Sequence, residues 1–232
     1  MGQICLPAGC VDAVRFSLID ACTGEAVAGA SNGYIATCIK DVTLTPNVTE
    51  GDETILETNC GTKCWQTRKN DRLDNITVEM TLLNPDYYLQ SLINGVTLLS
   101  DATPDEIGYI QDENAVAPWL SVEIFEQVPS EACDSSGINY RRLVLLKTRF
   151  QPVTFEAEDP FRLVKLTGVT APTDVSGWAS GGGGTGVAGP FNDFPLDLTG
   201  STARSQYIEV QETLGAALTG TCGYTAVPAG TP

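Results

Sequence analysis

Hydrophobic and polar residues alternate along much of the chain with a period of two. The clearest run is residues 75–82, where Ile76, Val78, Met80 and Leu82 fall on one side and polar residues on the other. This period is typical of a strand, because successive side chains point to opposite faces of a sheet. Weaker runs cover residues 14–19, 34–45, 120–126, 140–150, 153–156, 163–170 and 206–212. The pattern predicts a mainly β fold of about eight strands, built as a sandwich or barrel.

One segment breaks the alternation and predicts a short helix over residues 84–95. Asn84, Pro85 and Asp86 are typical of a helix start, and Gly95 is typical of a helix end. Its apolar residues recur at helical spacing, so we expect one face to pack on a sheet. The resulting fold class is mainly β, with one short flanking α-helix.

A long polar segment, residues 46–72, lies between two predicted strands. We expect residues 54–59 and 63–67 to pair across Gly61, which makes a hairpin that projects from the body. A projecting hairpin needs a partner surface to become fixed, so this segment is the candidate contact site. The candidate contact residues are Glu50, Asp52, Glu53, Lys63, Trp65, Arg68 and Lys69.

We expect the whole chain, residues 1–232, to form a single domain. Its termini are expected to form arms at about residues 1–12 and 216–232. Residues 171–195 form a glycine-rich loop, but no Gly-Lys-Ser/Thr follows the glycines, which argues against a phosphate site. Aromatic residues in this loop are expected to anchor it, with exposed contact as the alternative. These aromatic residues are Trp178, Phe191 and Phe194.

Charge and composition narrow the function. The chain has 29 acidic and 13 basic residues, a formal net charge of -16 and no histidine. The charge disfavours tight binding of nucleic acid, and the missing histidine excludes Ser-His-Asp and Cys-His catalysis. Acidic groups at 101–106, 112–113 and 156–159 fit a solvated face better than a catalytic pair. We therefore predict a protein that is not an enzyme and has no catalytic residue, cofactor or metal.

Eight cysteines are spread over the chain, and none has the two-residue spacing of a zinc or thioredoxin-like motif. Buried thiols with one or two disulfides are expected, and a four-cysteine metal site is the disfavoured alternative. No apolar run is long enough to cross a bilayer, and the N-terminus lacks the features of a signal peptide. We expect the protein to begin in a cytoplasm and to contact no membrane.

The order of these parts resembles the major tail (tail tube) proteins of long-tailed bacteriophages, especially those of actinobacteria. In that family a "D-x-x-x-V-x-L-x-L" strand runs into "x-P-D/E" and a helix that ends near a glycine. The stretch from Asp71 or Asp74, through Asn84-Pro85-Asp86, to Gly95 is similar. The resemblance covers about residues 14–195. Less specific similarity is found at residues 149–153, 158–162, 166–168 and 178–195.

The resemblance implies a β-sandwich subunit that forms hexameric rings, which stack into a hollow tail tube. Implied partners are further copies of the chain and the tape-measure, terminator and baseplate proteins. Phage DNA would pass through without specific binding, because an acidic lumen repels its phosphates. The implied location is the virion tail, assembled in the host bacterial cytoplasm. Residues 46–72 would then make the contact between rings.

Three alternatives stay open. An extracellular binding module for a receptor or glycan would use Trp65 and Trp178, with glycosylation sequons at Asn47 and Asn75. A carboxylate-pair glycosidase or an oxygen-ligand metalloenzyme would need one of the acidic groups. Another tail component, such as a terminator or baseplate hub, would share the fold.

Overall fold

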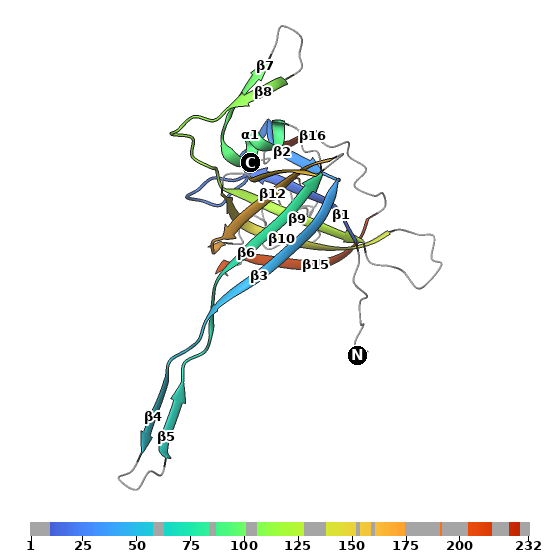
Figure 1. Ribbon diagram of the computed structural model, residues 1–232. Helices are drawn as coiled ribbons and strands as arrows, with labels where there is room; N and C mark the ends of the chain where they lie inside the picture. The colour runs from blue at the N-terminus through green and yellow to red at the C-terminus, as the bar shows by residue number, and fades with distance from the viewer. Residues whose placement is uncertain are drawn as a thin grey trace.

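The computed structural model describes residues 10–57, 63–83, 87–100, 106–127, 138–151, 154–158, 161–174, 191, 204–214 and 223–227. These residues form sixteen strands and one helix (Figure 1). The first half comprises β1 (Cys10–Leu18), β2 (Gly29–Ala36), β3 (Ile39–Thr49), β4 (Glu53–Glu57), β5 (Lys63–Arg68), β6 (Arg72–Leu83), α1 (Tyr87–Asn94), β7 (Thr97–Ser100) and β8 (Glu106–Ile110). The second half comprises β9 (Leu120–Gln127), β10 (Ile138–Phe150), β11 (Thr154–Glu158), β12 (Phe161–Thr170), β13 (Thr173–Asp174), β14 (Arg204–Ser205), β15 (Tyr207–Leu214) and β16 (Gly223–Val227).

Ten strands make one antiparallel sheet in the order β16-β2-β1-β9-β10-β12-β6-β3, with β15 added to β10 and β11 added to β12. The sheet is not closed into a barrel, and it curls so that β3 approaches β1. Three two-stranded ladders, β4-β5, β7-β8 and β13-β14, stand apart from it. The prediction of a mainly β, sandwich-like fold with one short helix is confirmed.

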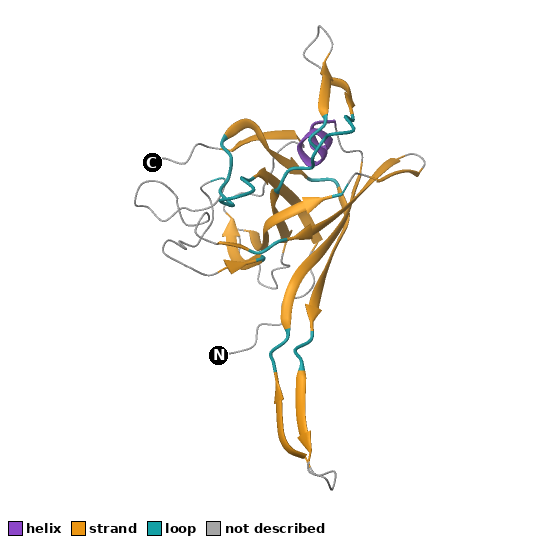
Figure 2. Cartoon of the chain, turned by 90° about the vertical axis from the view of Figure 1, so that its left-hand side faces the viewer, coloured by secondary structure: helices purple, strands orange, loops and turns teal. Residues whose placement is uncertain are grey.

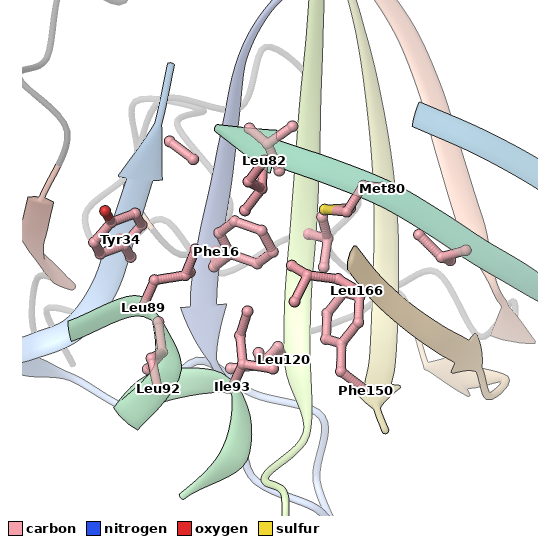
Figure 3. Close-up of a cluster of buried hydrophobic side chains, with 14 of the residues drawn as sticks. Phe16, Tyr34, Met80, Leu82, Leu89, Leu92, Ile93, Leu120, Phe150 and Leu166 are labelled. Atoms are coloured by element: carbon pink, nitrogen blue, oxygen red, sulfur yellow. The ribbon is translucent and has the colours of Figure 1, made fainter. Parts of the chain in front are cut away.

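The core lies inside the curl, between the β6-β12 part of the sheet, the β1-β9-β10 part and helix α1 (Figure 3). The alternating residues of β6 supply one wall, and Phe16 of β1 meets Phe150 of β10 edge-on at 6.1 Å between ring centroids. Leu89, Leu92 and Ile93 of α1 are buried against these strands, as their spacing predicts. The period-two pattern therefore located the core face of β6 correctly.

Helix α1 ends where the sequence predicts. Gly95 has a φ of 65°, and its backbone N–H donates to the Ser91 carbonyl at 2.9 Å. Glycine is the residue that adopts this left-handed geometry at low cost, and it ends many helices. The predicted start signals, residues 84–86, lie outside the described residues.

The opposite face of β1, β9 and β10 is also buried, which alternation alone did not predict. Arg15 and Glu123 form an ion pair there, with the Arg15 Nε 2.7 Å from a Glu123 carboxylate oxygen. The Arg15 guanidinium lies 3.9 Å from the centroid of the Phe191 ring and 5.4 Å from that of Phe125, and Arg142 also lies over the Phe125 ring. Phe191 thus contacts the sheet, as expected of an anchor, while Trp178 and Phe194 lie outside the described residues.

The sheet forks at β10, whose far edge pairs first with β15 and then with β12. Gln206 lies in this fork, where its amide oxygen accepts a hydrogen bond from the Thr170 hydroxyl and its amide nitrogen donates to the Leu73 and Asp74 carbonyls. The Thr170 oxygen accepts in turn from the Ile76 backbone N–H. This network joins β6 and β12 to the residue that precedes β15.

Several expectations need correction. Residues 34–45 are not one strand, because β2 pairs with β1 whereas β3 pairs with β6, and the chain changes partner between residues 36 and 39. The last three residues of the expected N-terminal arm belong to β1, and the expected C-terminal arm contains β16, which pairs with β2. The β7-β8 ladder was not foreseen, because its strands are short.

The cysteine prediction is wrong for the three cysteines whose side chains are described. Cys10, Cys22 and Cys38 are free thiols, and all three are exposed rather than buried. The side chains of the other five cysteines lie outside the described residues.

Candidate assembly site: the projecting arm

The arm, defined here as the described residues 50–57 and 63–71, extends away from the body as a continuation of β3 and β6 (Figures 1 and 2). β3 pairs with β6 as far as Thr49 opposite Arg72. Beyond that point β4 pairs with β5, from Glu53 opposite Arg68 to Leu56 opposite Trp65, with a shift in register before Glu57. The predicted pairing of the two halves of the hairpin is confirmed, and the ladder that carries it starts inside the core.

A short neck, residues 50–52 and 69–71, joins the two ladders. The Lys69 backbone N–H donates to the Asp52 carbonyl at 3.0 Å, which keeps the two chain segments together. Gly51 passes so close to the Lys69 carbonyl that a side chain at position 51 would collide with it. The neck therefore requires glycine for close backbone approach rather than for an unusual φ.

Asp71 fixes the neck from the β6 side. One of its carboxylate oxygens accepts from the Gly51 backbone N–H at 3.0 Å and from the Arg68 guanidinium at 3.1 Å. The Gly51 hydrogen bond and then the charge of Arg68 hold the pKa of Asp71 below its usual value of 3.8. Asp71 is consequently ionised at neutral pH and links both sides of the neck.

A second carboxylate, that of Asp74 in β6, links the two strands nearer the body. Asp74 accepts from the Thr49 hydroxyl across the ladder and from the Arg72 guanidinium at 2.8 Å. The Thr49 hydrogen bond and then Arg72 lower the pKa of Asp74. Next to this pair, the Asn47 amide donates to Asn75 at 2.6 Å. Side-chain hydrogen bonds thus cross the ladder where the arm leaves the core.

The predicted contact residues lie on both sides of the neck and along the hairpin. Asp52 and Lys69 form an ion pair at 3.3 Å, with exposed side-chain fractions of 84% and 78%. Glu50 and Glu53 are exposed, and Arg68 contacts Asp71. Lys63 and Trp65 are placed in β5 by their backbone, and their side chains lie outside the described residues.

The arm also exposes apolar surface. The exposed fraction is 53% for Val48, next to the neck, and 37% for Ile55, in β4. Apolar side chains on a thin two-stranded ladder have little of their own chain to pack on. They are therefore available to a partner surface.

Sequence reasoning missed three residues that hold the neck: Gly51, Asp71 and Asp74. The available signal was the dipeptides Gly51-Asp52 and Asn70-Asp71, whose residue types favour turns and local side-chain hydrogen bonds. Two such dipeptides in the middle of a predicted hairpin mark the break between its two ladders.

Other kinds of site receive no support from the described residues. Within them, no group of three or more acidic or cysteine side chains lies together as a metal site would require. Asp112 and Glu113 are exposed, as expected of a solvated acidic face. The helix that is described is too short to cross a membrane. No family model and no curated protein matches the chain.

Proposed function

We propose that this protein is a structural subunit of a bacteriophage tail tube, which assembles through stacked rings of identical copies. The observation that carries the proposal is the arm, a long ladder rooted in the core that exposes charged and apolar side chains away from the body. A contact made by an arm on a different surface of the next copy is heterologous, and such contacts propagate instead of closing on themselves. Rings of six follow from the family resemblance.

The negative charge of the chain supports the proposal of a tube through which DNA passes. A net charge of -16 per copy gives a tube whose wall repels DNA phosphates, so that a duplex slides through without binding. The proposed partners are further copies, the tape-measure, terminator and baseplate proteins, and DNA in transit. The proposed location is the virion tail, after assembly in the bacterial cytoplasm, with no catalytic role.

The arm also has a physical reason to find a partner. A two-stranded ladder is marginally stable alone in water, and its exposed ion pairs contribute little because solvent screens them. Burial against a second copy would supply the stabilisation that the isolated arm lacks. We therefore assign the contact between rings to the arm.

The test is assembly of the purified protein, followed by size-exclusion chromatography and negative-stain electron microscopy. Wild-type protein is expected to form rings or hollow tubes. Deletion of residues 52–69 joins Gly51 to Asn70, whose carbonyl already lies beside Gly51. This variant is expected to keep its circular dichroism spectrum and urea midpoint but to form no tubes. Tubes of normal length from it would refute the role of the arm.

A strictly monomeric wild-type protein at high concentration would contradict the proposal itself. In that case glycan-array binding by the monomer would favour the binding-module alternative. The oligomeric state and the glycan binding are measured on the same purified wild-type protein.

A further inference from the structure

We infer that the arm of one copy docks on the opposite end of the next copy, on the described residues 97–100 and 106–119, which comprise β7, β8 and the loop after β8. The inference rests on the proposed self-assembly and names the surface that receives the arm. The two hairpins project from opposite ends of the molecule (Figures 1 and 2). Copies joined in this way share one direction, as a stack requires.

The β7-β8 hairpin has one packed face and one open face. On the packed side, the Tyr109 ring lies 6.1 Å from the Tyr87 ring of α1. On the other face, Thr97 pairs opposite Ile110 and Leu99 opposite Gly108, so Leu99 and Ile110 point the same way. Since Gly108 has no side chain, only glycine lies across from Leu99. The hairpin is thus held by α1 while it presents two apolar side chains outward.

The open face is unusually apolar for exposed surface. The exposed fractions are 39% for Leu99, 54% for Ile110 and 69% for Val116 in the following loop. These three residues are nearly half of the large hydrophobic residues that are exposed in the described part of the chain, and Val48 and Ile55 next to and on the arm are two more. Exposed apolar side chains therefore gather at the two ends that the inference joins.

The two ends differ in charge, because the arm carries basic residues and the receiving end carries none. Residues 97–119 hold five acidic residues and no basic one, and Asp112 and Glu113 there are exposed. Residues 46–72 hold four of the thirteen basic residues of the chain: Lys63, Arg68, Lys69 and Arg72. Residues 46–72 also hold five acidic residues, so their four basic and five acidic residues give a formal charge of -1, against -5 for residues 97–119. In a protein with a net charge of -16, this nearly neutral segment is repelled less by the acidic end than a more acidic segment would be.

The ion pairs within the arm do not prevent this contact. Asp52–Lys69 and Arg68–Asp71 are both exposed pairs, and exposed pairs typically contribute about 0–1 kcal/mol. Their basic partners can therefore shift towards the acids of a second copy at small cost. An arm-to-arm contact, by contrast, would pair like surfaces around a two-fold axis and would end growth at a dimer.

The decisive experiment mixes two defective variants. One lacks residues 52–69 and keeps the receiving end, and the other carries Ile110→Asp and Val116→Asp and keeps the arm. Each variant alone is expected to remain unstacked by analytical ultracentrifugation. Their equimolar mixture is expected to give a species of twice the unstacked mass, because one productive contact remains, and no tubes. Ile110→Val is the matched control and is expected to form tubes.

A mixture that sediments like its components overturns the inference, and so do normal tubes from the Ile110→Asp, Val116→Asp variant. In both cases wild-type tubes would leave the proposed function standing. Absence of wild-type assemblies would instead overturn both. A photo-crosslinking residue at position 55 gives an independent readout by mass spectrometry. Adducts are expected in residues 97–119 of another copy, and adducts confined to residues 46–72 would contradict the inference.

Discussion

The body and the arm both contain ion pairs, but these pairs differ in how far they are removed from water. In the body, the Arg15–Glu123 pair is almost fully removed from water, with exposed side-chain fractions of 4% and 1%. In the arm, the Asp52–Lys69 pair is more than three-quarters exposed on both sides. Burial strengthens the attraction and makes an unpaired partner costly, whereas water screens the exposed pair.

The same contrast holds for packing. β6 starts at the neck of the arm and ends in the core, so its two halves experience different surroundings. Ile76, Val78, Met80 and Leu82 are buried in the core, whereas Arg72 at the start of the strand is exposed. The body is stabilised by removing side chains from water, and the arm is shaped by its backbone ladder and the neck hydrogen bonds. The comparison predicts that stability and assembly can be changed separately.

The largest expected effect is loss of the buried pair. Glu123→Ala leaves the Arg15 guanidinium buried without its carboxylate, which should lower the free energy of unfolding by about 3–5 kcal/mol. The change is measured by urea unfolding. The double variant Arg15→Met, Glu123→Leu should recover most of the loss, because neither charge remains. A Glu123→Ala effect as small as that of an exposed pair would break the comparison.

The next effect comes from the core end of β6. Leu82→Ala removes a side chain that is 1% exposed and should destabilise the protein by about 2–5 kcal/mol in urea unfolding. Glu79→Ala, at an exposed position on the same strand, is the matched control and should change stability by less than about 0.5 kcal/mol. Equal effects of the two substitutions would contradict the assignment of the core face.

A smaller effect is expected at alkaline pH. Burial, and then the hydrogen bond to Asp12, raise the pKa of Tyr140 to about 12. The folded state therefore favours the protonated phenol. This contribution is complete below the unfolded pKa of about 10 and is lost as pH rises towards 12. Urea midpoints of the wild type should fall in this range, and Tyr140→Phe should flatten the dependence; an unchanged slope would contradict it.

The smallest effect concerns the neck. Because the pKa of Asp71 is lowered in the folded protein, its contribution is present above the usual value of 3.8 and is lost as pH falls through the folded pKa. Asp71→Asn should speed hydrogen exchange at the Gly51 amide at neutral pH while the urea midpoint stays unchanged. Lowering the pH below 3.8 should reduce the protection factor of the same amide in the wild type, once the rate is corrected for the intrinsic slowing of exchange in acid. A shifted midpoint would show that neck and body are coupled.

Features set by local patterns were predictable. The core face of β6, the end of α1 at Gly95 and the paired halves of the arm follow from alternation, capping and turn preference. The break between β2 and β3 was not predictable, since the alternation continues while the partner strand changes. Nor was the burial of Arg15 and Glu123, because alternation assigns them to a wet face and residues distant in sequence, such as Phe191, cover that face.

The candidate site also has some features that the sequence predicts and others that it does not. Short runs on either side of a polar turn predicted the hairpin. Among the candidate contact residues, those with described side chains are exposed, and their contact role stays a prediction. The neck depends on contacts across 17 to 20 positions, such as Gly51 with Asp71, which no short window of sequence contains. The β7-β8 hairpin was not predicted from the sequence, because its ladder pairs only a few residues.

The unbroken ladder from the core into the arm has a consequence for quality control. A slip of one residue between β3 and β6 would turn the buried side chains of β6 towards water and move Asp71 away from Gly51. A misregistered chain would then present a misdirected arm. If tubes grow through the arm, a growing end selects subunits by the correctness of their folding, and defective copies are rejected before they are incorporated.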